Sequence, residues 1–279
     1  MLHTKSTRNL KRLIAVALVI IGAVTLYAWQ IEPRWLQIRE IAVELNIPYE
    51  FDGYTIAQIS DIHASPDLPP RQLERAIAKI SQFHPDILVV TGDWVSYRAE
   101  YAQEPAQIVS TAQTNSGIYG ILGNHDHWTN ADTVARLVEE VGIKLLRNQS
   151  VKVERNGAAI YLAGIDDIWE EQHDLHTALR DVPADASVIL LAHEPDIADE
   201  IAEESRVVFQ LSGHSHGGQV SPPLIGPLIL PYLAQKYPAG LAQVGGLLVY
   251  TNRGLGNMRP LVRFNCRPEI TLITLHSRK

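Results

Sequence analysis

The amino-acid sequence predicts an α/β fold in which two β-sheets pack face to face and helices cover the outside. Three observations support this prediction. Short apolar runs rich in Ile and Val are typical of buried strands. They alternate with segments whose apolar residues recur at helical spacing, and further strands follow near the end of the chain. The chain has 279 residues, of which 46% are hydrophobic and 20% charged, so it has a globular composition and room for one large domain or two small ones.

Each expected element follows from a local pattern. Buried strands are expected at 54–60, 86–92, 117–122, 187–192 and 207–213, and further strands at 38–45, 143–146, 151–154, 158–163, 247–250 and 270–275. Helices are expected at 71–83, 105–112, 132–141, 173–180 and 195–203. Asn130 or Asp132 is expected to cap the third helix, and Asn156-Gly157 to form a turn. Strand 38–45 should lie at a sheet edge, and the last two strands should close the second sheet.

Polar side chains follow the five buried strands at the point where each strand ends. They are Asp61, His63, Asp93, Asn124, His125, Asp126, His193, His214 and His216. In an open α/β sheet, ligands gather beyond the carboxyl ends of the strands, so these side chains should share one rim. One histidine alone would more often be an ordinary core or surface residue. Five histidines mixed with Asp and Asn at one rim indicate a functional site.

The stretch Gly123-Asn124-His125-Asp126 places three candidate functional side chains next to one another after a strand. Gly123 allows an abrupt turn after the strand. Asn124 offers an amide oxygen, which is a neutral ligand for a divalent metal. His125 is the side chain most easily used as a proton donor near neutral pH, and Asp126 is expected to orient it.

These motifs resemble those of the calcineurin-like metallophosphoesterases. The matching set runs in order from Asp61-x-His63 through Gly92-Asp93, Gly123-Asn124-His125-Asp126 and His193 to Gly213-His214-x-His216. The segment 263–270 is similar to that of a membrane-associated bacterial subgroup. The resemblance implies a four-layer α/β/β/α sandwich of two mixed sheets over residues 51–279, preceded by a connector and edge strand at 32–50.

The resemblance also implies roles for the rim residues. Asp93 would bridge two divalent metal ions. One metal ion would bind Asp61, His63 and His216, and the other Asn124, His193 and His214. Metal-activated water would attack phosphorus, and His125 would protonate the leaving oxygen as general acid. The mixed oxygen and nitrogen ligands fit manganese, iron or zinc.

The sequence departs from the family pattern after Asp93. Protein phosphatases of this family carry a second Asp and an Arg shortly after the bridging Asp, whereas here the chain continues Trp94-Val95-Ser96-Tyr97-Arg98. This departure disfavours phosphoprotein substrates. Arg253 and Arg259 are alternative candidates for binding the phosphate, each weighed against an ordinary surface role. Asp166 and Asp167 follow a strand and are weighed between the same rim and an ordinary role as helix-capping or solvated residues.

The N-terminal segment 1–31 is expected to be a basic flank and a membrane anchor. Residues 13–31 are uncharged and about the length of one spanning helix, and Lys5, Arg8, Lys11 and Arg12 precede them. The positive-inside rule places the N-terminus in the cytoplasm and the catalytic domain outside a single-pass cell or inner membrane. A cleaved signal peptide is the alternative for the segment, and the cytoplasmic face of the membrane is the alternative location.

Charge and composition narrow the function further. Without the four basic residues of segment 1–31, the chain has 20 Lys and Arg against 31 Asp and Glu, a net charge near −11 that disfavours long nucleic acid. No phosphate-cradling P-loop is present, so an NTPase is not indicated. One cysteine, Cys266, excludes an intrachain disulfide. The proline-rich stretch 222–233 either packs on the sheet or presents apolar surface beside the site.

The sequence therefore predicts a membrane-anchored, dinuclear-metal-dependent phosphodiesterase or pyrophosphatase acting on a lipid-linked or nucleotide-linked phosphate. A cell-envelope phosphomonoesterase, a pyrophosphatase of the UDP-2,3-diacylglucosamine type and a non-catalytic metal-binding or envelope-binding module are the alternatives. The oligomeric state has no signature in the sequence.

Overall fold

The computed structural model describes residues 2–66 and 70–278, so Met1 of the expected anchor segment lies outside the described residues. The first sheet has six strands in the order β1-β12-β2-β3-β4-β5. Their bounds are β1 Gln37–Leu45, β2 Tyr54–Ile59, β3 Ile87–Thr91, β4 Ile118–Ile121, β5 Lys144–Leu145 and β12 Glu269–Ser277. Strands β2 to β5 run parallel, whereas β12 is antiparallel to β2 and parallel to β1. Strand β1 lies at the edge, as predicted.

The second sheet also has six strands, in the order β10-β11-β9-β8-β7-β6. Their bounds are β6 Gln149–Arg155, β7 Ala158–Gly164, β8 Val188–Leu191, β9 Val207–Ser212, β10 Gly240–Val244 and β11 Leu247–Thr251. The four central strands are parallel, and β6 and β10 join them antiparallel. Strand β11 belongs here as predicted, but the expectation that 270–275 also closes this sheet is wrong, because β12 pairs with β1 and β2 of the first sheet.

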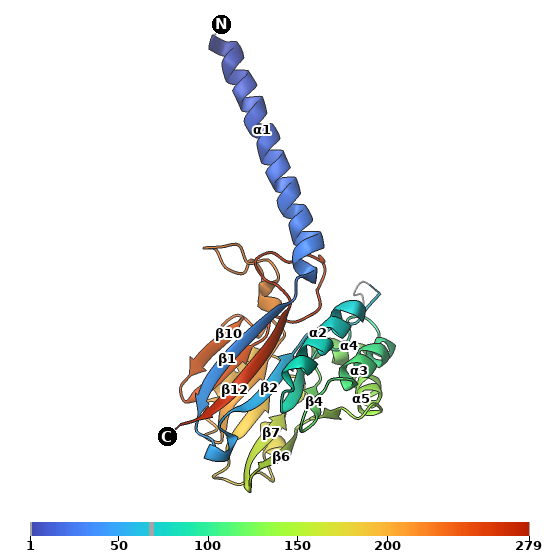
Figure 1. Cartoon of the computed structure of the whole chain (residues 1–279), viewed down its shortest axis with the longest axis vertical. Coiled ribbons are helices and arrows are strands. Elements are labelled where there is room, and N and C mark those ends of the chain that lie inside the picture. The colour runs from blue at the N-terminus through green and yellow to red at the C-terminus, as the bar shows by residue number, and fades with distance from the viewer. Residues whose placement is uncertain (1, 67–69, 279) are drawn as a thin grey trace.

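Helices cover the outer faces of both sheets, and those of the first sheet are labelled in Figure 1. On the first sheet they are α2 Pro70–Phe83, α3 Gln103–Ser110 and α5 Ala131–Glu139, and on the second α6 Leu175–Ala178 and α7 Ala198–Ile201. Asn130 caps α5 by accepting the Thr133 backbone N–H, as predicted. Helices α6 and α7 are shorter than the expected 173–180 and 195–203. Helix α7 begins late because Pro195–Ile197 forms a 3-10 turn, η5. Helix α4, Asn124–Thr129, was not predicted.

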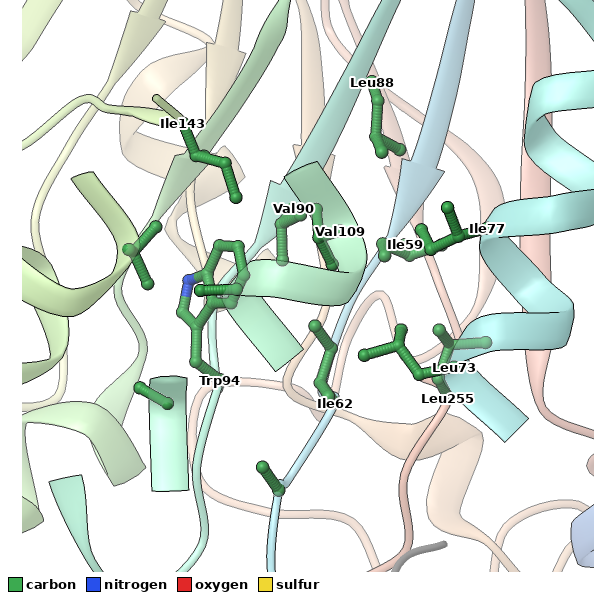
Figure 2. Close-up of a cluster of buried hydrophobic side chains, with 14 of the residues drawn as sticks. Ile59, Ile62, Leu73, Ile77, Leu88, Val90, Trp94, Val109, Ile143 and Leu255 are labelled. Carbon is green, nitrogen blue, oxygen red and sulfur yellow. The ribbon is translucent and has the colours of Figure 1, made fainter. Parts of the chain in front are cut away.

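Three apolar cores separate four layers, as the resemblance implied. Ile56, Ile87 and Val89 of the first sheet meet Leu162 and Phe209 of the second in the central core. On alternate positions the first sheet faces α2, α3 and α5, and the second faces α6 and α7, because side chains of a strand point to opposite faces in turn. Figure 2 shows the outer core of the first sheet, where Trp94 and Ile77 lie among the fully buried side chains.

Helix α1, Leu2–Leu26, projects away from this sandwich (Figure 1). The stretch Asn9–Arg34 is long and apolar enough to cross a membrane, by length and composition. Its foot, the π-helical turn η1 Tyr27–Ile31, is fixed to the sandwich. The Arg263 backbone N–H donates to the Ala28 carbonyl at 2.9 Å, the Tyr27 and Phe264 rings meet edge to face, and the Cys266 N–H donates to Glu32.

Candidate metal centre

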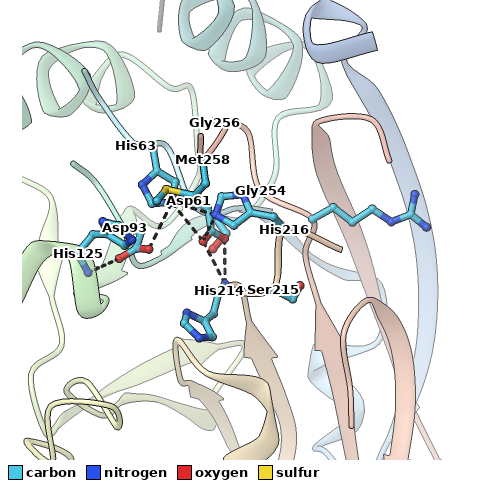
Figure 3. Close-up of polar contacts among 12 residues, drawn as sticks. Asp61, His63, Asp93, His125, His214, Ser215, His216, Gly254, Gly256 and Met258 are labelled. Atoms are coloured by element: carbon cyan, nitrogen blue, oxygen red, sulfur yellow. Dashed lines mark hydrogen bonds and ion pairs between the residues drawn. The ribbon is translucent and has the colours of Figure 1, made fainter. Parts of the chain in front are cut away.

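The predicted metal ligands lie together at the carboxyl ends of the parallel strands of both sheets, and Figure 3 shows Asp61, His63, Asp93, His214 and His216 among them. Asp61 and His63 follow β2, Asp93 follows β3, and His214 and His216 follow β9. All five have backbone φ angles between +50° and +66°. Residues other than glycine seldom adopt this left-handed conformation, and where they do they cluster at functional sites. The backbone therefore turns sharply at each strand end and directs these side chains to one place.

A first cluster consists of Asp61, His63 and His216, whose potential ligand atoms all lie within 4.8 Å of one another. The two ring Nε2 atoms of His63 and His216 face each other at 2.9 Å, and Asp61 Oδ1 lies 3.4 Å from His216 Nε2. Burial lowers the pKa of His63 to about 3. Its ring is therefore neutral at neutral pH and keeps the lone pair that a metal ion requires.

A second cluster consists of Asp93, His193 and His214. Asp93 Oδ2 lies 3.3 Å from His193 Nε2 and 3.4 Å from His63 Nε2, so this one carboxylate oxygen lies between the two clusters. Burial opposes the charged form of Asp93, but His193 and His125 outweigh it and lower the pKa of Asp93 well below its usual value. Asp93 is thus an anionic bridge in position between two groups of histidines.

Among the buried atoms at this site that have no hydrogen-bond partner in the described structure are Asn124 Oδ1 and His193 Nε2. Leaving such atoms unsatisfied costs about 1–3 kcal/mol each, so orphaned atoms indicate a missing ligand. Both belong to the residues that the resemblance assigned to the second metal ion. The pair of Asp and His clusters therefore suits a divalent metal centre.

Backbone carbonyls fix the tautomers of two of the histidines. His193 Nδ1 lies 2.7 Å from the Thr91 carbonyl and His214 Nε2 lies 2.8 Å from the Tyr232 carbonyl. Because a carbonyl only accepts, each of these nitrogens carries a proton, which leaves His193 Nε2 and His214 Nδ1 as the nitrogens available to a metal ion. Burial opposes the charged form of His193, but Asp93 outweighs it and raises the pKa of this ring well above its usual value, so a metal ion bound at Nε2 would displace a proton. Burial also lowers the pKa of His214 to about 3, which keeps this ring neutral.

Gly123 is required by close packing at the centre of the site. A Cβ at this position would lie 2.5 Å from Asp93 Oδ1 and 2.7 Å from His193 Nε2, distances at which atoms overlap. Only glycine lets β4 run this close to the bridging carboxylate before α4 begins.

His125 lies at the first turn of α4, beside the clusters. Its backbone N–H donates to Asp93 Oδ1 at 2.9 Å, and its Nδ1–H donates to the Ser96 carbonyl at 3.3 Å. The His125 ring lies edge to face with His63, with ring centres 4.8 Å apart. Nδ1 is therefore engaged with the backbone, and Nε2 is the nitrogen left to exchange a proton.

The expectation that Asp126 orients His125 is not supported by the described contacts. The Asp126 carboxylate accepts backbone N–H groups of Gly123, Trp94 and Val95, at 2.9 to 3.2 Å. These bonds hold the turn after Asp93 against the start of α4. Asp126 is therefore a positioning residue for Asp93, not a partner of the His125 ring.

Arg253 does not line the groove at the site. Its Nε lies 3.6 Å from a carboxylate oxygen of buried Glu269. Arg259, the other predicted phosphate-binding candidate, does line the groove. Asp166 pairs with His127 at 2.7 Å and Arg147 at 2.8 Å, Asp167 accepts the Glu170 N–H, and neither aspartate is among the residues that line the groove.

Arg263 is a structural centre that the sequence did not reveal. Its fully buried guanidinium donates to Asn257 Oδ1 and to the carbonyls of Arg253, Gly254, Gly256 and Cys266, at 2.6 to 3.2 Å. The segment held in this way supports Asp61, because the Gly256 N–H donates to the Asp61 carbonyl at 2.7 Å. A single arginine therefore ties the foot of α1, this loop and the first cluster together.

A groove of about 470 Å³ opens from the metal clusters. One end is formed by Asp93, Asn124, His125, His214 and His216. Its other walls are mainly apolar and comprise Trp128, Trp169, Val220, Leu228, Ile229, Pro231, Met258, Pro260 and Val262. Met258, from the loop held by Arg263, is drawn beside the first cluster in Figure 3. The groove is thus polar where the clusters lie and hydrophobic beyond them.

Comparison with known proteins agrees with this geometry. The model of the calcineurin-like phosphoesterase family matches residues 54–218. The uncharacterized metallophosphoesterase YkuE of Bacillus subtilis is 36% identical over 90% of this chain and 89% of its own. The phosphodiesterase YaeI of Escherichia coli is 28% identical, over 89% and 92%.

Two further comparisons concern chemistry and fold. The UDP-2,3-diacylglucosamine pyrophosphatase LpxG of Chlamydia trachomatis is 28% identical over 91% of this chain and 94% of its own. Among solved structures, the NAD nucleotidase of Haemophilus influenzae is 15% identical with a TM-score of 0.50, covering 72% of this chain and 45% of that one. At 15% identity, the similarity to the NAD nucleotidase concerns the fold alone.

Proposed function

Since the chain belongs to the calcineurin-like phosphoesterase family, we propose that it is a dinuclear-metal-dependent hydrolase of phosphodiesters or pyrophosphates. The position of Asp93 Oδ2, 3.3 to 3.4 Å from a histidine of each cluster, is the observation that carries this proposal. Asp61, His63 and His216 would hold one metal ion, and Asn124, His193 and His214 the other. When bound, two such ions, here Mn, Fe or Zn, polarise the phosphate and supply an activated water.

The chain's own residues provide the rest of the reaction. Hydrolysis forms a bond from phosphorus to the water oxygen and breaks the bond to the leaving oxygen, which must gain a proton. His125 supplies that proton from Nε2 while the Ser96 carbonyl fixes its ring. Asp93 orients His125 by accepting its backbone N–H. The family and the relative named phosphodiesterase support this assignment.

The charge of the groove favours diesters over monoesters. Beyond the metal clusters, Arg259 is the one Lys or Arg among the described residues that line the groove. The second ester group of a diester can lie on the apolar walls of the groove, whereas the additional negative charge of a monoester dianion meets only this one arginine there. We expect the full chain to prefer methyl p-nitrophenyl phosphate to p-nitrophenyl phosphate by about tenfold in kcat/KM, the value of one charge-assisted hydrogen bond. A preference for the monoester, measured with each divalent metal added after chelation, would support the phosphomonoesterase alternative.

We further propose that α1 is a retained anchor with the catalytic domain outside the cytoplasm. Lys11 and Arg12 precede the apolar stretch, as the positive-inside rule requires for this orientation. A reporter enzyme fused after Lys279 should be active outside the cytoplasm, and mass spectrometry of the purified protein should find residues 13–31. Activity only in the cytoplasm would reverse the orientation and favour a cytosolic lipid precursor of the kind that LpxG is named for.

A further inference from the structure

The segments that line the groove beside the metal clusters also contact the foot of α1. Phe264 packs on Tyr27 of the α1 foot, and its backbone pairs with Val220 at the start of the loop 220–233. The Leu228 N–H of that loop donates to the Val220 carbonyl at 3.0 Å. One segment, 258–266, therefore holds the foot of the helix on one side and the loop on the other. The loop accordingly lies beside the foot of α1 in Figure 1.

The loop 220–233 presents large apolar side chains to the outside. Leu224 is fully exposed, and Ile225 and Ile229 are 74% and 81% exposed. Soluble proteins rarely expose a cluster of this kind without a partner. Trp29 and Trp35, also about half exposed, mark the foot of α1, where aromatic residues commonly lie at the membrane surface. The bilayer that α1 can span is thus the surface nearest to these side chains.

Beyond the clusters, the walls of the groove offer few polar groups to a ligand other than Arg259. The Gln219 side chain, the main amide there, is engaged at both ends, because it donates to the Met258 carbonyl at 3.0 Å and accepts the Met258 N–H. Leu228, Ile229 and Val262 contribute only hydrocarbon. A ligand that fits both ends of the groove has a phosphate at the clusters and a hydrocarbon chain beyond them.

We propose that the substrate is a lipid phosphoester of the bilayer, whose hydrocarbon chain lies along Leu228, Ile229 and Val262 while its phosphate reaches the metal clusters. This inference rests on the proposed phosphodiesterase function and selects lipid-linked over nucleotide-linked substrates. The loop 220–233 dips into the outer leaflet, so the substrate enters the groove without leaving the membrane.

The test uses the full chain in lipid nanodiscs, loaded with Mn²⁺, and two probes with the same leaving group. Wild type should hydrolyse octyl p-nitrophenyl phosphate with a higher kcat/KM than the methyl ester. Each buried methylene multiplies kcat/KM by about fourfold, so three buried methylenes give about 60-fold. Ile229→Asp should reduce this octyl-to-methyl ratio to a few fold. The matched variant Leu241→Asp, at an exposed position of β10 outside both the loop 220–233 and the groove lining, should keep the wild-type ratio.

The outcomes separate the two proposals. Absence of hydrolysis of both esters by the wild type would overturn the proposed function itself. Hydrolysis with equal rates for both esters would leave that function standing and overturn the lipid inference. An octyl preference that persists in Ile229→Asp would also overturn it, since partition into the nanodisc would then explain the preference. A higher kcat/KM for thymidine 5′-(p-nitrophenyl phosphate) than for the octyl ester would point to a nucleotide substrate instead.

Discussion

Asp93→Asn is expected to lower kcat/KM for any phosphodiester by at least about 100-fold. This loss is larger than the loss of activity usually seen when a residue that hydrogen-bonds to a metal ligand is replaced. Two divalent cations about 4 Å apart repel strongly, and a neutral amide cannot offset that repulsion. The variant should bind at most one metal ion per chain. Both results follow from the position of Asp93 Oδ2 between the two histidine clusters.

The fold should survive this substitution. Asp93 has φ +55°, a conformation that asparagine tolerates, and an amide oxygen can still accept the His125 N–H. The charged partners of Asp93 are histidines, which can lose their proton when the carboxylate is removed, so that no unpaired charge is left buried. Asp174→Asn, on the exposed cap of α6, is the matched control and should retain activity. An Asp93→Asn variant that binds two metal ions and turns over normally would refute the dinuclear assignment.

His125→Ala is expected to slow hydrolysis of a dialkyl phosphate by roughly 10²–10⁴-fold, the usual value of one positioned acid. An alkoxide is a poor leaving group and must be protonated as its bond breaks, whereas p-nitrophenolate leaves without help. The nitrophenyl ester should therefore be slowed much less. Metal content should not change if His125 is not a ligand. Measurement of both esters and of bound metal on the same preparation checks all three statements.

The metal measurement matters because His125 also lies close to His63 and Asp93, within reach of a shared ion. Loss of metal in His125→Ala would identify His125 as a ligand. Equal slowing of both esters with metal retained would mean that His125 positions the phosphate. His127→Ala is the matched control on the same helix, because His127 pairs with Asp166 outside the groove and should leave the ratio of the two esters unchanged.

The sequence was sufficient to predict where the site lies. Buried parallel strands have an unmistakable apolar pattern, and the residues that end them must meet at one rim. It did not reveal which sheet each late strand joins. Both β11 and β12 are apolar and largely buried, so their periodicity carries no information about their neighbours, and β12 was assigned to the wrong sheet.

Sequence patterns could not predict the contacts that support the site. Asp126 binds the backbone of Trp94, 32 residues away, and Arg263 binds carbonyls that any residue could provide. Such partners are backbone groups with no sequence signature. For the same reason Arg253 could not be distinguished in advance from a phosphate-binding arginine, although in the structure Glu269 lies beside it.

The proline-rich stretch 222–233 could be interpreted in two ways from sequence, as an irregular core segment or as apolar surface beside the site. Leu224 and Ile225 are exposed in the structure, whereas Ala234, just after the stretch, is buried. Prolines prevent the loop from joining a sheet, and its position next to the α1 foot depends on Phe264, more than 30 residues later. Only the fold brings these segments together.

The most direct test of the dinuclear centre is the metal content of the wild-type chain, measured by elemental analysis after full chelation and titration with Mn²⁺, with phosphodiester hydrolysis followed in parallel. We predict two tightly bound ions per chain and activity that is absent after chelation and returns as the sites fill. Full activity with one ion per chain, or unchanged activity in the chelated protein, would contradict the assignment of Asp93 as a bridge between two metal ions.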